Sequence, residues 1–139
     1  MNPLSAAPQN TPKRILIADD AASARDLVRS ILGRSGYEIF EAEDGEQALE
    51  RATSLRPDLV ILDLQMPKFD GCEVASKLRT MPLFEWTPIL ALSAAISQTE
   101  HAKLIQAGFS RFLAKPISPA RLRSTIIDMF DAVHTQEES

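Results

Sequence analysis

The chain has 139 residues, a formal net charge of -4 and a hydrophobic content of 45%, which suit one domain with a single core. This mildly acidic balance argues against a nucleic-acid-binding module, because such modules normally carry a basic face. Cys72 is the only cysteine, which excludes an internal disulfide. No apolar run forms a secretory signal or approaches the ~20 residues that span a membrane. We therefore expect a cytoplasmic protein.

The two ends of the chain differ in pattern from its middle. Residues 1–12 contain three prolines among small polar residues and show no periodicity, which predicts a flexible N-terminal leader. Residues 135–139 are polar and are expected to form a C-terminal tail. Residues 13–134 remain as one folded domain.

Strand-like and helix-like segments alternate along this domain. The hydrophobic periodicity predicts strands at 14–18, 37–42, 58–63, 88–93 and 110–114, and helices at 22–34, 45–55, 71–80, 97–107 and 118–133. Five units of one strand and one helix are typical of an α/β fold, a doubly wound five-stranded parallel sheet with helices on both faces.

Local signals support several of these helices. Capping residues mark three helix starts: Asp44 with Gln47, Ser97 with Glu100, and Ser118 before Pro119. The helix at 22–34 carries one apolar stripe, formed by Ala24, Leu27, Val28, Ile31 and Leu32. The apolar surface of the last helix is wider than one core stripe needs, so we expect part of it to contact a partner.

Acidic residues follow two of the predicted strands at the point where each strand ends. Asp63 closes a run of four aliphatic residues, and the pair Asp19-Asp20 follows the first strand. Since open α/β sheets bind ligands at the carboxyl ends of their strands, the three carboxylates would converge if these strands are neighbours. Like charges that converge usually need a bound cation.

Two further strand ends carry polar groups. The fourth strand ends at Ser93 and the fifth is followed by Lys115-Pro116. One sheet edge would then hold three carboxylates, a hydroxyl and an ammonium group. Metal-assisted phosphoryl transfer requires these groups: a nucleophile, a cation site and donors to the phosphoryl oxygens.

At this point the chain resembles the receiver domain of bacterial two-component response regulators, the CheY-like family. The resemblance extends from residue 13 to about 133 and rests on motifs that occur in the family's order: Asp19-Asp20, Asp63 with Met66-Pro67 and Asp70-Gly71, Ser93-Ala94, and Lys115-Pro116. Each motif alone is weak, but all of them fit the same alternating pattern.

The resemblance implies a phosphoacceptor site that uses Mg²⁺. Asp63 would accept a phosphoryl group from a phosphohistidine on a sensor histidine kinase or phosphotransfer protein. Asp19 and Asp20 would hold Mg²⁺ together with Asp63 and the backbone carbonyl of Gln65. Independently, Mg²⁺ prefers a few carboxylates plus water and substrate oxygens to an all-protein cage.

The resemblance also assigns roles to residues around the acceptor. Ser93 would bond one phosphoryl oxygen and Lys115 another, Phe112 matches the family's switch aromatic, and Lys115-Pro116 its cis peptide. Gln65 and Ala95 occupy the two positions that tune the lifetime of the phosphate in the family. Ala95 leaves access for water, whereas the Gln65 amide could either orient a water or shield the site.

Without this context, simpler interpretations would hold for most of these residues. Asp19-Asp20 would be a solvated turn, Lys115 a surface charge and Phe112 a core aromatic, so the switch role of Phe112 rests on the resemblance alone. We expect His101 and His134 to face solvent without metal partners. Trp86 is expected to pack on the sheet edge.

These observations favour a phosphorylation-dependent signalling switch that catalyses only its own phosphorylation and dephosphorylation. A phosphorelay intermediate, or a receiver fragment of a larger regulator, would share the site. A Mg²⁺-dependent aspartyl phosphatase is less consistent, because Asp63-Leu64-Gln65 lacks the second acid of Asp-x-Asp. A flavin-binding module would need a phosphate loop after the first strand, where Asp19-Asp20 would repel a phosphate.

The expected partners follow from this interpretation. They are the phosphodonor protein and a downstream effector on a separate chain, with no direct contact to nucleic acid or membrane. We expect a monomer or a phosphorylation-dependent dimer.

Overall fold

The computed structural model describes residues 11–94 and 97–138, and side chains through residue 132. Strands and helices alternate in these residues: β1 (Arg14–Ala18), α2 (Ala22–Gly33), β2 (Glu38–Ala42), α3 (Gly45–Leu55), β3 (Leu59–Asp63), α4 (Gly71–Arg79), the 3₁₀ helix η2 (Pro82–Phe84), β4 (Ile89–Ser93), α5 (Gln98–Ala107), β5 (Arg111–Ala114) and α6 (Pro119–Glu138). The predicted alternation is confirmed.

The largest difference from the predicted elements is at the end of the chain. Helix α6 continues to Glu138, so residues 135–138 of the expected polar tail are helical. The short helix η2 was not predicted from the pattern. Of the expected leader, residues 1–10 lie outside the described residues.

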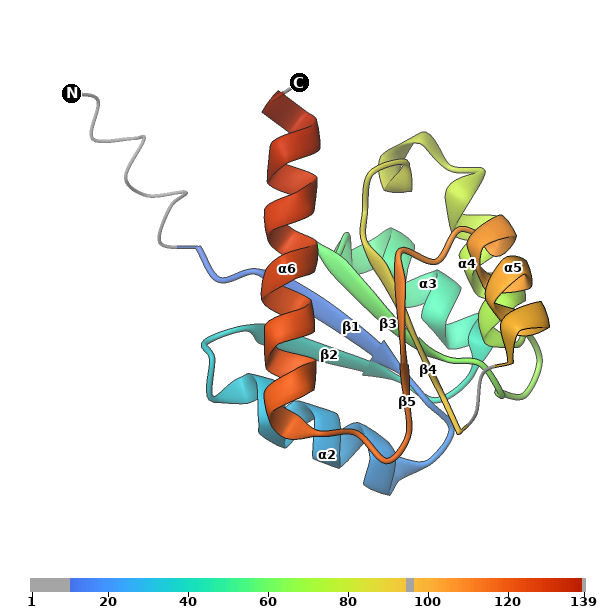
Figure 1. The fold of residues 1–139 in the computed structure, drawn as a ribbon, viewed down its shortest axis with the longest axis horizontal. Coiled ribbons are helices and arrows are strands. Elements are labelled where there is room, and N and C mark those ends of the chain that lie inside the picture. Colours follow the sequence, from blue (N-terminus) through green and yellow to red (C-terminus); the bar gives the residue numbers. More distant parts are fainter. Residues whose placement is uncertain (1–10, 95–96, 139) are drawn as a thin grey trace.

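The five strands form one parallel sheet in the order β2-β1-β3-β4-β5. This order confirms the doubly wound fold and places β1 beside β3, with Ala18 paired to Leu62. It also pairs Ser93 at the end of β4 with Ala114 at the end of β5. The acid pair after β1 and Asp63 at the end of β3 therefore reach the same sheet edge (Figure 1).

Two apolar layers cover the sheet (Figure 1). Helices α2 and α6 pack on one face, where the core comprises Ile15, Ile17, Val28, Ile31, Leu32, Leu59, Ile61, Leu90, Leu92, Leu113, Leu122, Ile126 and Met129. Helices α3, α4 and α5 pack on the other face, on residues such as Leu16, Val60 and Leu62. All five residues of β3 are buried, as expected for a strand covered on both faces.

The three predicted helix caps are confirmed. Asp44 accepts a hydrogen bond from the backbone N–H of Gln47 at 2.8 Å. Ser97 forms a reciprocal capping box with Glu100 at the start of α5, and the hydroxyl of Ser118 accepts from the N–H of Arg121 at 3.3 Å. A fourth start carries a capping box that sequence reading missed, between Asp70 and Glu73 at the start of α4. Such caps accept hydrogen bonds from the first backbone N–H groups of a helix, which have no partner within the helix.

Helices α2 and α6 each leave an apolar side chain exposed. In α2 the side chains of Val28, Ile31 and Leu32 are buried, but Leu27 is 48% exposed. In α6 Ile127 is 53% exposed, so the apolar surface of this helix does extend beyond its core contact. Within the described residues, no helix has the length and apolar character needed to cross a membrane.

Candidate functional site

Three carboxylates converge where β1 and β3 end. One oxygen atom from each of Asp19, Asp20 and Asp63 lies within 4.8 Å of the others. Asp19 and Asp63 are buried, whereas Asp20 is exposed. This donor set consists only of hard carboxylate oxygens, so it fits a cation such as Mg²⁺.

Lys115 approaches this cluster from the loop after β5. Its Nζ donates a hydrogen bond to Oδ2 of Asp19 at 3.2 Å and lies 3.8 Å from Oδ1 of Asp63. The peptide between Lys115 and Pro116 is cis, as the resemblance implied. The ammonium group therefore contacts both buried acids.

The environment raises the pKa of Asp63 above its ordinary value of 3.8. Burial contributes most to this shift, followed by the charge of Asp19, with a smaller contribution from Asp20. The ammonium of Lys115 and the hydrogen bond from the Gln65 N–H act in the opposite direction. Neighbouring charge of the same sign thus makes ionised Asp63 less favourable, which is the effect that a bound cation would reverse.

The loop that follows Asp63 packs tightly against its neighbours. A Cβ atom at Gly71 would lie 2.6 Å from the backbone oxygen of Asp63, and one at Gly45 would lie 2.0 Å from that of Phe69. Both positions therefore require glycine. The N–H of Gly71 donates to the oxygen of Leu64 at 3.1 Å, and that of Gly45 to Pro67 at 3.3 Å. These contacts fix the loop that carries Gln65 beside the acids.

Ser93 and Phe112 lie on the adjoining strands β4 and β5. Ser93 is buried, and its backbone oxygen accepts a hydrogen bond from the N–H of Lys115 at 2.7 Å. Phe112 is half-buried, and its ring centroid lies 4.6 Å from that of His101 on α5. His101 is exposed as predicted, but this ring contact was not foreseen.

Two hollows are lined by residues of the candidate site. One of about 160 Å³ lies between α2 and the loop after β5 and is lined by Asp19, Ala24, Leu27, Val28, Leu92, Lys115, Pro116 and Ile117. Another of about 430 Å³ lies between α4 and α5, where its lining includes Gln65, Ser93 and Lys103. The first hollow includes Asp19, whereas the second includes none of the three clustered acids.

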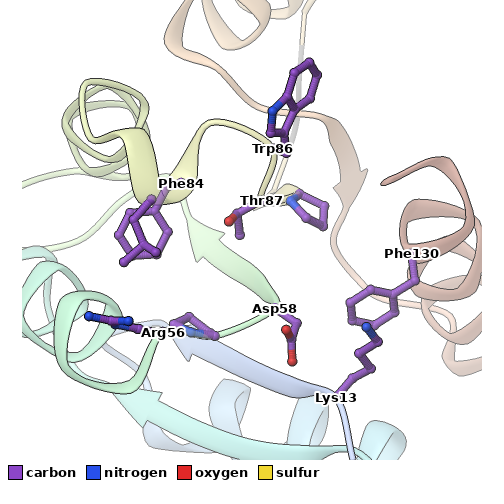
Figure 2. Close-up of a pocket in the computed structure, with 10 residues that line it drawn as sticks. Lys13, Arg56, Asp58, Phe84, Trp86, Thr87 and Phe130 are labelled. Atoms are coloured by element: carbon purple, nitrogen blue, oxygen red, sulfur yellow. The ribbon is translucent and has the colours of Figure 1, made fainter. Parts of the chain in front are cut away.

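A third hollow of about 330 Å³ lies at the opposite edge, where the strands begin (Figure 2). Its lining includes Lys13, Asp58 and Phe130 but none of the clustered acids. Trp86 stands at its rim and is 54% exposed, so the predicted packing of this side chain on the sheet edge is wrong. The hollow does not belong to the candidate site.

The structure brings together most of the side chains that the sequence singled out. Asp19, Asp20, Asp63 and Lys115 form one cluster, and Ser93 lies at the adjoining strand end. Ala95 lies outside the described residues, and the side chain of His134 lies outside the described side chains. Sequence reading missed Arg25, whose Nη1 donates to the backbone oxygen of Asp19 at 2.8 Å, because no local pattern links these residues.

The family model for the response regulator receiver domain matches residues 15–127. The chain belongs to this family. The receiver domain resembles the alkaline phosphatase synthesis transcriptional regulatory protein PhoP of Bacillus subtilis, with 38% identity over 82% of this chain and 47% of that protein. It thus spans about half the length of this curated relative.

Two solved structures resemble this receiver domain along almost their whole length. The chemotaxis response regulator CheY4 of Vibrio cholerae matches with a TM-score of 0.82 and 33% identity, over 86% of this chain and 99% of that chain. The receiver domain of the sensor histidine kinase PA1611 from Pseudomonas aeruginosa matches with a TM-score of 0.76 and 29% identity, over 83% and 94% of the two chains. In that receiver domain a magnesium ion is coordinated in the active site cleft.

Proposed function

We propose that this receiver domain is a signalling switch that accepts a phosphoryl group on Asp63 in a Mg²⁺-dependent reaction. One observation carries the proposal: Asp63 is buried beside two other acids and Lys115 at the edge where parallel sheets bind ligands. The family model supports it through a match that spans all of these residues.

Asp19, Asp20 and Asp63 would hold the cation together with the backbone carbonyl of Gln65. Mg²⁺ would neutralise the acids and the oxygens of the incoming phosphoryl group. The donor set of the described cluster supports this assignment, as does the magnesium ion in the related Pseudomonas aeruginosa receiver domain.

In the transfer step, one carboxylate oxygen of Asp63 forms a bond to phosphorus while the phosphorus–nitrogen bond of the donor's phosphohistidine breaks. The bonding electron pair returns to the imidazole nitrogen. Lys115 pairs with one phosphoryl oxygen, and the hydroxyl of Ser93 donates to another. Lys115 already lies 3.8 Å from Asp63, so this role needs only a small displacement.

The donor protein, a sensor histidine kinase or a phosphotransfer protein, would dock over α2 beside the acids. The half-exposed Leu27 and the hollow that it shares with Val28 and Ile117 support this location. An apolar patch adjoining a charged site suits a partner that must bring its phosphohistidine to Asp63.

Phosphorylation would then change the face formed by α5, β5 and α6. Once Ser93 turns toward the phosphate, space opens for the ring of Phe112, whose present position is held by contact with His101. The phosphoryl group biases this two-state element through contacts that it makes in only one state. A downstream effector on another chain would bind the altered face.

The test is phosphorylation by a small phosphodonor, phosphoramidate, with Mg²⁺, followed by intact mass measurement and peptide mapping. We expect one added phosphate on Asp63 and none in excess chelator. Asp63→Asn should stay unlabelled, whereas Asp70→Asn should label like wild type, because Asp70 caps α4 and Asn retains that cap. Equal labelling of wild type and Asp63→Asn would contradict the assignment.

A phosphorelay intermediate or a receiver fragment of a larger regulator would use the same site. The chain's match to half of a longer transcriptional regulator, and to the receiver domain of a sensor kinase, makes this a specific alternative. Mixing the phosphorylated protein with a histidine phosphotransfer protein distinguishes the two functions. Rapid return of the phosphate to histidine supports the relay; retention with altered NMR signals on α5, β5 and α6 supports the switch.

The lifetime of the phosphate is a separate part of the proposal. Gln65 is exposed next to Asp63, so its amide can reach a water near the phosphoryl group. Hydrolysis rates of Gln65→Ala and Ala95→Gln, compared with wild type, would test both positions as lifetime-tuning residues.

A further inference from the structure

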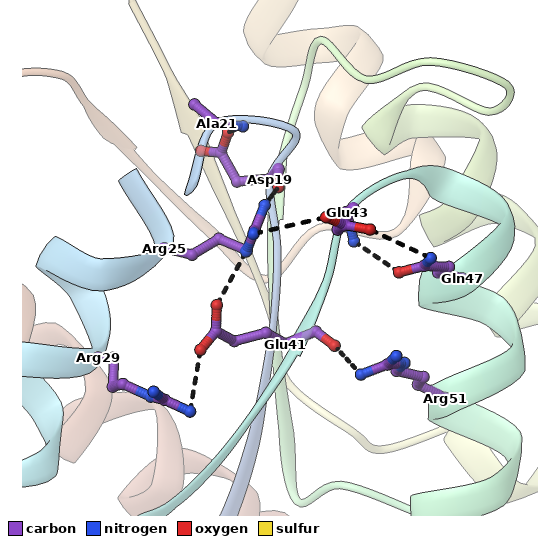
Figure 3. Close-up of polar contacts among 8 residues, drawn as sticks. All are labelled: Asp19, Ala21, Arg25, Arg29, Glu41, Glu43, Gln47 and Arg51. Atoms are coloured by element: carbon purple, nitrogen blue, oxygen red, sulfur yellow. Dashed lines mark hydrogen bonds and ion pairs between the residues drawn. The ribbon is translucent and has the colours of Figure 1, made fainter. Parts of the chain in front are cut away.

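The guanidinium of Arg25 links the loop after β1 to the edge strand β2 (Figure 3). Arg25 lies in the first turn of α2, and its side chain is only 11% exposed. Its Nη1 donates to the backbone oxygen of Asp19 at 2.8 Å, and its Nε donates to Oε1 of Glu41 at 2.8 Å. One rigid planar group therefore connects these two residues.

Glu41 is itself held in place. Its side chain is 21% exposed, and its second carboxylate oxygen pairs with Nη2 of Arg29 at 3.0 Å. Its backbone oxygen accepts a hydrogen bond from Arg51 at 2.6 Å. A contact from Arg25 to Glu43 is longer, 3.8 Å, and Glu43 is 66% exposed, so it adds little. Arg25 is thus fixed from the side of β2.

Asp19 and Asp20 differ in how they are held. The N–H of Asp19 donates to Ala42, and its two carboxylate oxygens contact the N–H of Ala21 and the Nζ of Lys115. In the described part of the chain, the carboxylate of Asp20 makes no hydrogen bond or ion pair. Its position depends on the peptide that joins it to Asp19, and Arg25 holds the oxygen of that peptide.

We propose that Arg25 is a positioning residue for the cation site. By holding the Asp19–Asp20 peptide, it directs the carboxylate of Asp20 toward the cation that Asp19 and Asp63 would share. The inference rests on the proposed function, because it requires Mg²⁺ to bind these acids. Partners that orient metal ligands typically change metal affinity by about tenfold or more when they are removed.

Electrostatics alone predicts the opposite effect. A cation near the acids repels Mg²⁺, so removal of the Arg25 charge should tighten Mg²⁺ binding. Removal of a positioning residue should weaken binding, because the Asp20 carboxylate is then free to adopt other directions. The sign of the change therefore separates the two accounts.

The experiment is isothermal titration of the full chain with Mg²⁺. We expect Arg25→Gln to bind Mg²⁺ about tenfold more weakly than wild type. Arg29→Gln is the matched control: it makes the same charge change on the same helix and against the same Glu41, but among the described residues Arg29 forms no hydrogen bond with Asp19. Its affinity should stay within roughly twofold of wild type, because its side chain is 57% exposed.

Arg25→Gln also leaves Glu41 with one arginine fewer, which can destabilise the fold. The double variant Arg25→Gln/Glu41→Gln has the net charge of wild type and removes the carboxylate that has lost its contact with Arg25. We expect it to melt closer to wild type in chelator, measured by circular dichroism, and still to bind Mg²⁺ weakly. Wild-type affinity in the double variant would mean that Arg25 acts through stability alone.

The possible results separate the inference from the proposed function. Unchanged or tighter Mg²⁺ binding by Arg25→Gln, with normal binding by wild type, overturns only the positioning role. Absence of Mg²⁺ binding by wild type overturns the cation site and the positioning role together. Equal weakening in Arg25→Gln and Arg29→Gln also overturns the inference, since of these two arginines Arg25 alone donates to the Asp19 oxygen in the described structure.

Discussion

Nζ of Lys115 lies 3.2 Å from Oδ2 of Asp19, although the two residues are separated by most of the chain. The same ammonium is 3.8 Å from Asp63, so it contacts both buried acids. Because Lys115 partly neutralises these acids, we expect changes of charge at this sheet edge to alter the free energy of unfolding.

Replacement of Lys115 should destabilise the metal-free protein. Lys115→Met leaves Asp19, which is 3% exposed, without its ammonium partner. We expect a loss of about 1–3 kcal/mol in the free energy of unfolding, measured by urea denaturation in chelator at neutral pH. Lys103→Met removes an exposed lysine of α5 that lines the hollow between α4 and α5 but makes no ion pair in the described residues. This variant should leave the free energy of unfolding almost unchanged. Equal losses would contradict a specific role for Lys115.

Replacement of Asp63 should have the opposite effect. Its raised pKa means that the folded state favours the uncharged form, and Asn is uncharged with a similar shape. Asp63→Asn should therefore melt higher than wild type in chelator at neutral pH, even though it cannot be phosphorylated. Asp70→Asn controls for the loss of one negative charge. A lower melting temperature for Asp63→Asn would mean that its carboxylate stabilises the metal-free fold.

The fold was predictable because its signals are local. Strands such as β1 and β3 carry an apolar run, α2 carries an apolar stripe, and Ser97 and Asp44 mark helix starts through residues three positions away. Convergence of Asp63 with Asp19 then follows from parallel strands, once β1 and β3 are neighbours. The order of the strands along the chain does not show that β1 lies beside β3. The resemblance to the receiver-domain family implied that arrangement.

Features that depend on contacts between distant segments were not predictable. The bonds from Arg25 to Asp19 and Glu41 join α2 to two strands, and no spacing rule relates these residues. Leu27 has the periodicity of a core residue, but the described elements cover only about half of it, and it is 48% exposed. Likewise, Trp86 follows a short 3₁₀ helix whose direction the sequence does not set, and the indole is left exposed.

The pH dependence of stability should reflect the raised pKa of Asp63. In the unfolded chain this carboxyl ionises near 3.8, whereas the folded state retains its proton to higher pH. Its contribution to stability therefore falls as pH rises from about 3.8 to the folded pKa and stays constant above it. The difference in unfolding free energy between Asp63→Asn and wild type, measured in chelator, should grow over this window and then level off. A difference that shrinks as pH rises would contradict the sign of the shift.

The contact between His101 and Phe112 should oppose the switch. Since the two ring centroids are 4.6 Å apart, the imidazole stabilises the ring of Phe112 in its present position. His101→Ala should therefore increase the chemical shift changes of β5 and α6 that a beryllofluoride phosphoryl mimic produces, or produce part of them without the mimic. Ala102→Gly, the next position on α5, controls for loss of helix stability. If the mimic produces the same chemical shift changes of β5 and α6 in wild type and His101→Ala, and the variant shows none of them without the mimic, this contact does not bias Phe112.

Mg²⁺ should stabilise the protein through the same three acids. At about tenfold excess over its dissociation constant, a ligand of the folded state adds on the order of 1.4 kcal/mol, which for a domain of this size is roughly 3–6 °C in melting temperature. Wild type should show this shift at fixed ionic strength, and Asp63→Asn a smaller one, because it has lost a ligand and had less repulsion to relieve. Mg²⁺ should therefore narrow the difference in melting temperature between the two proteins that we expect in chelator.

Asp58→Asn, which changes an acid at the opposite sheet edge, should show the same Mg²⁺-dependent rise in melting temperature as wild type. If wild type shows no shift with Mg²⁺ and Asp63→Asn melts lower in chelator, the three acids do not act as one cation site.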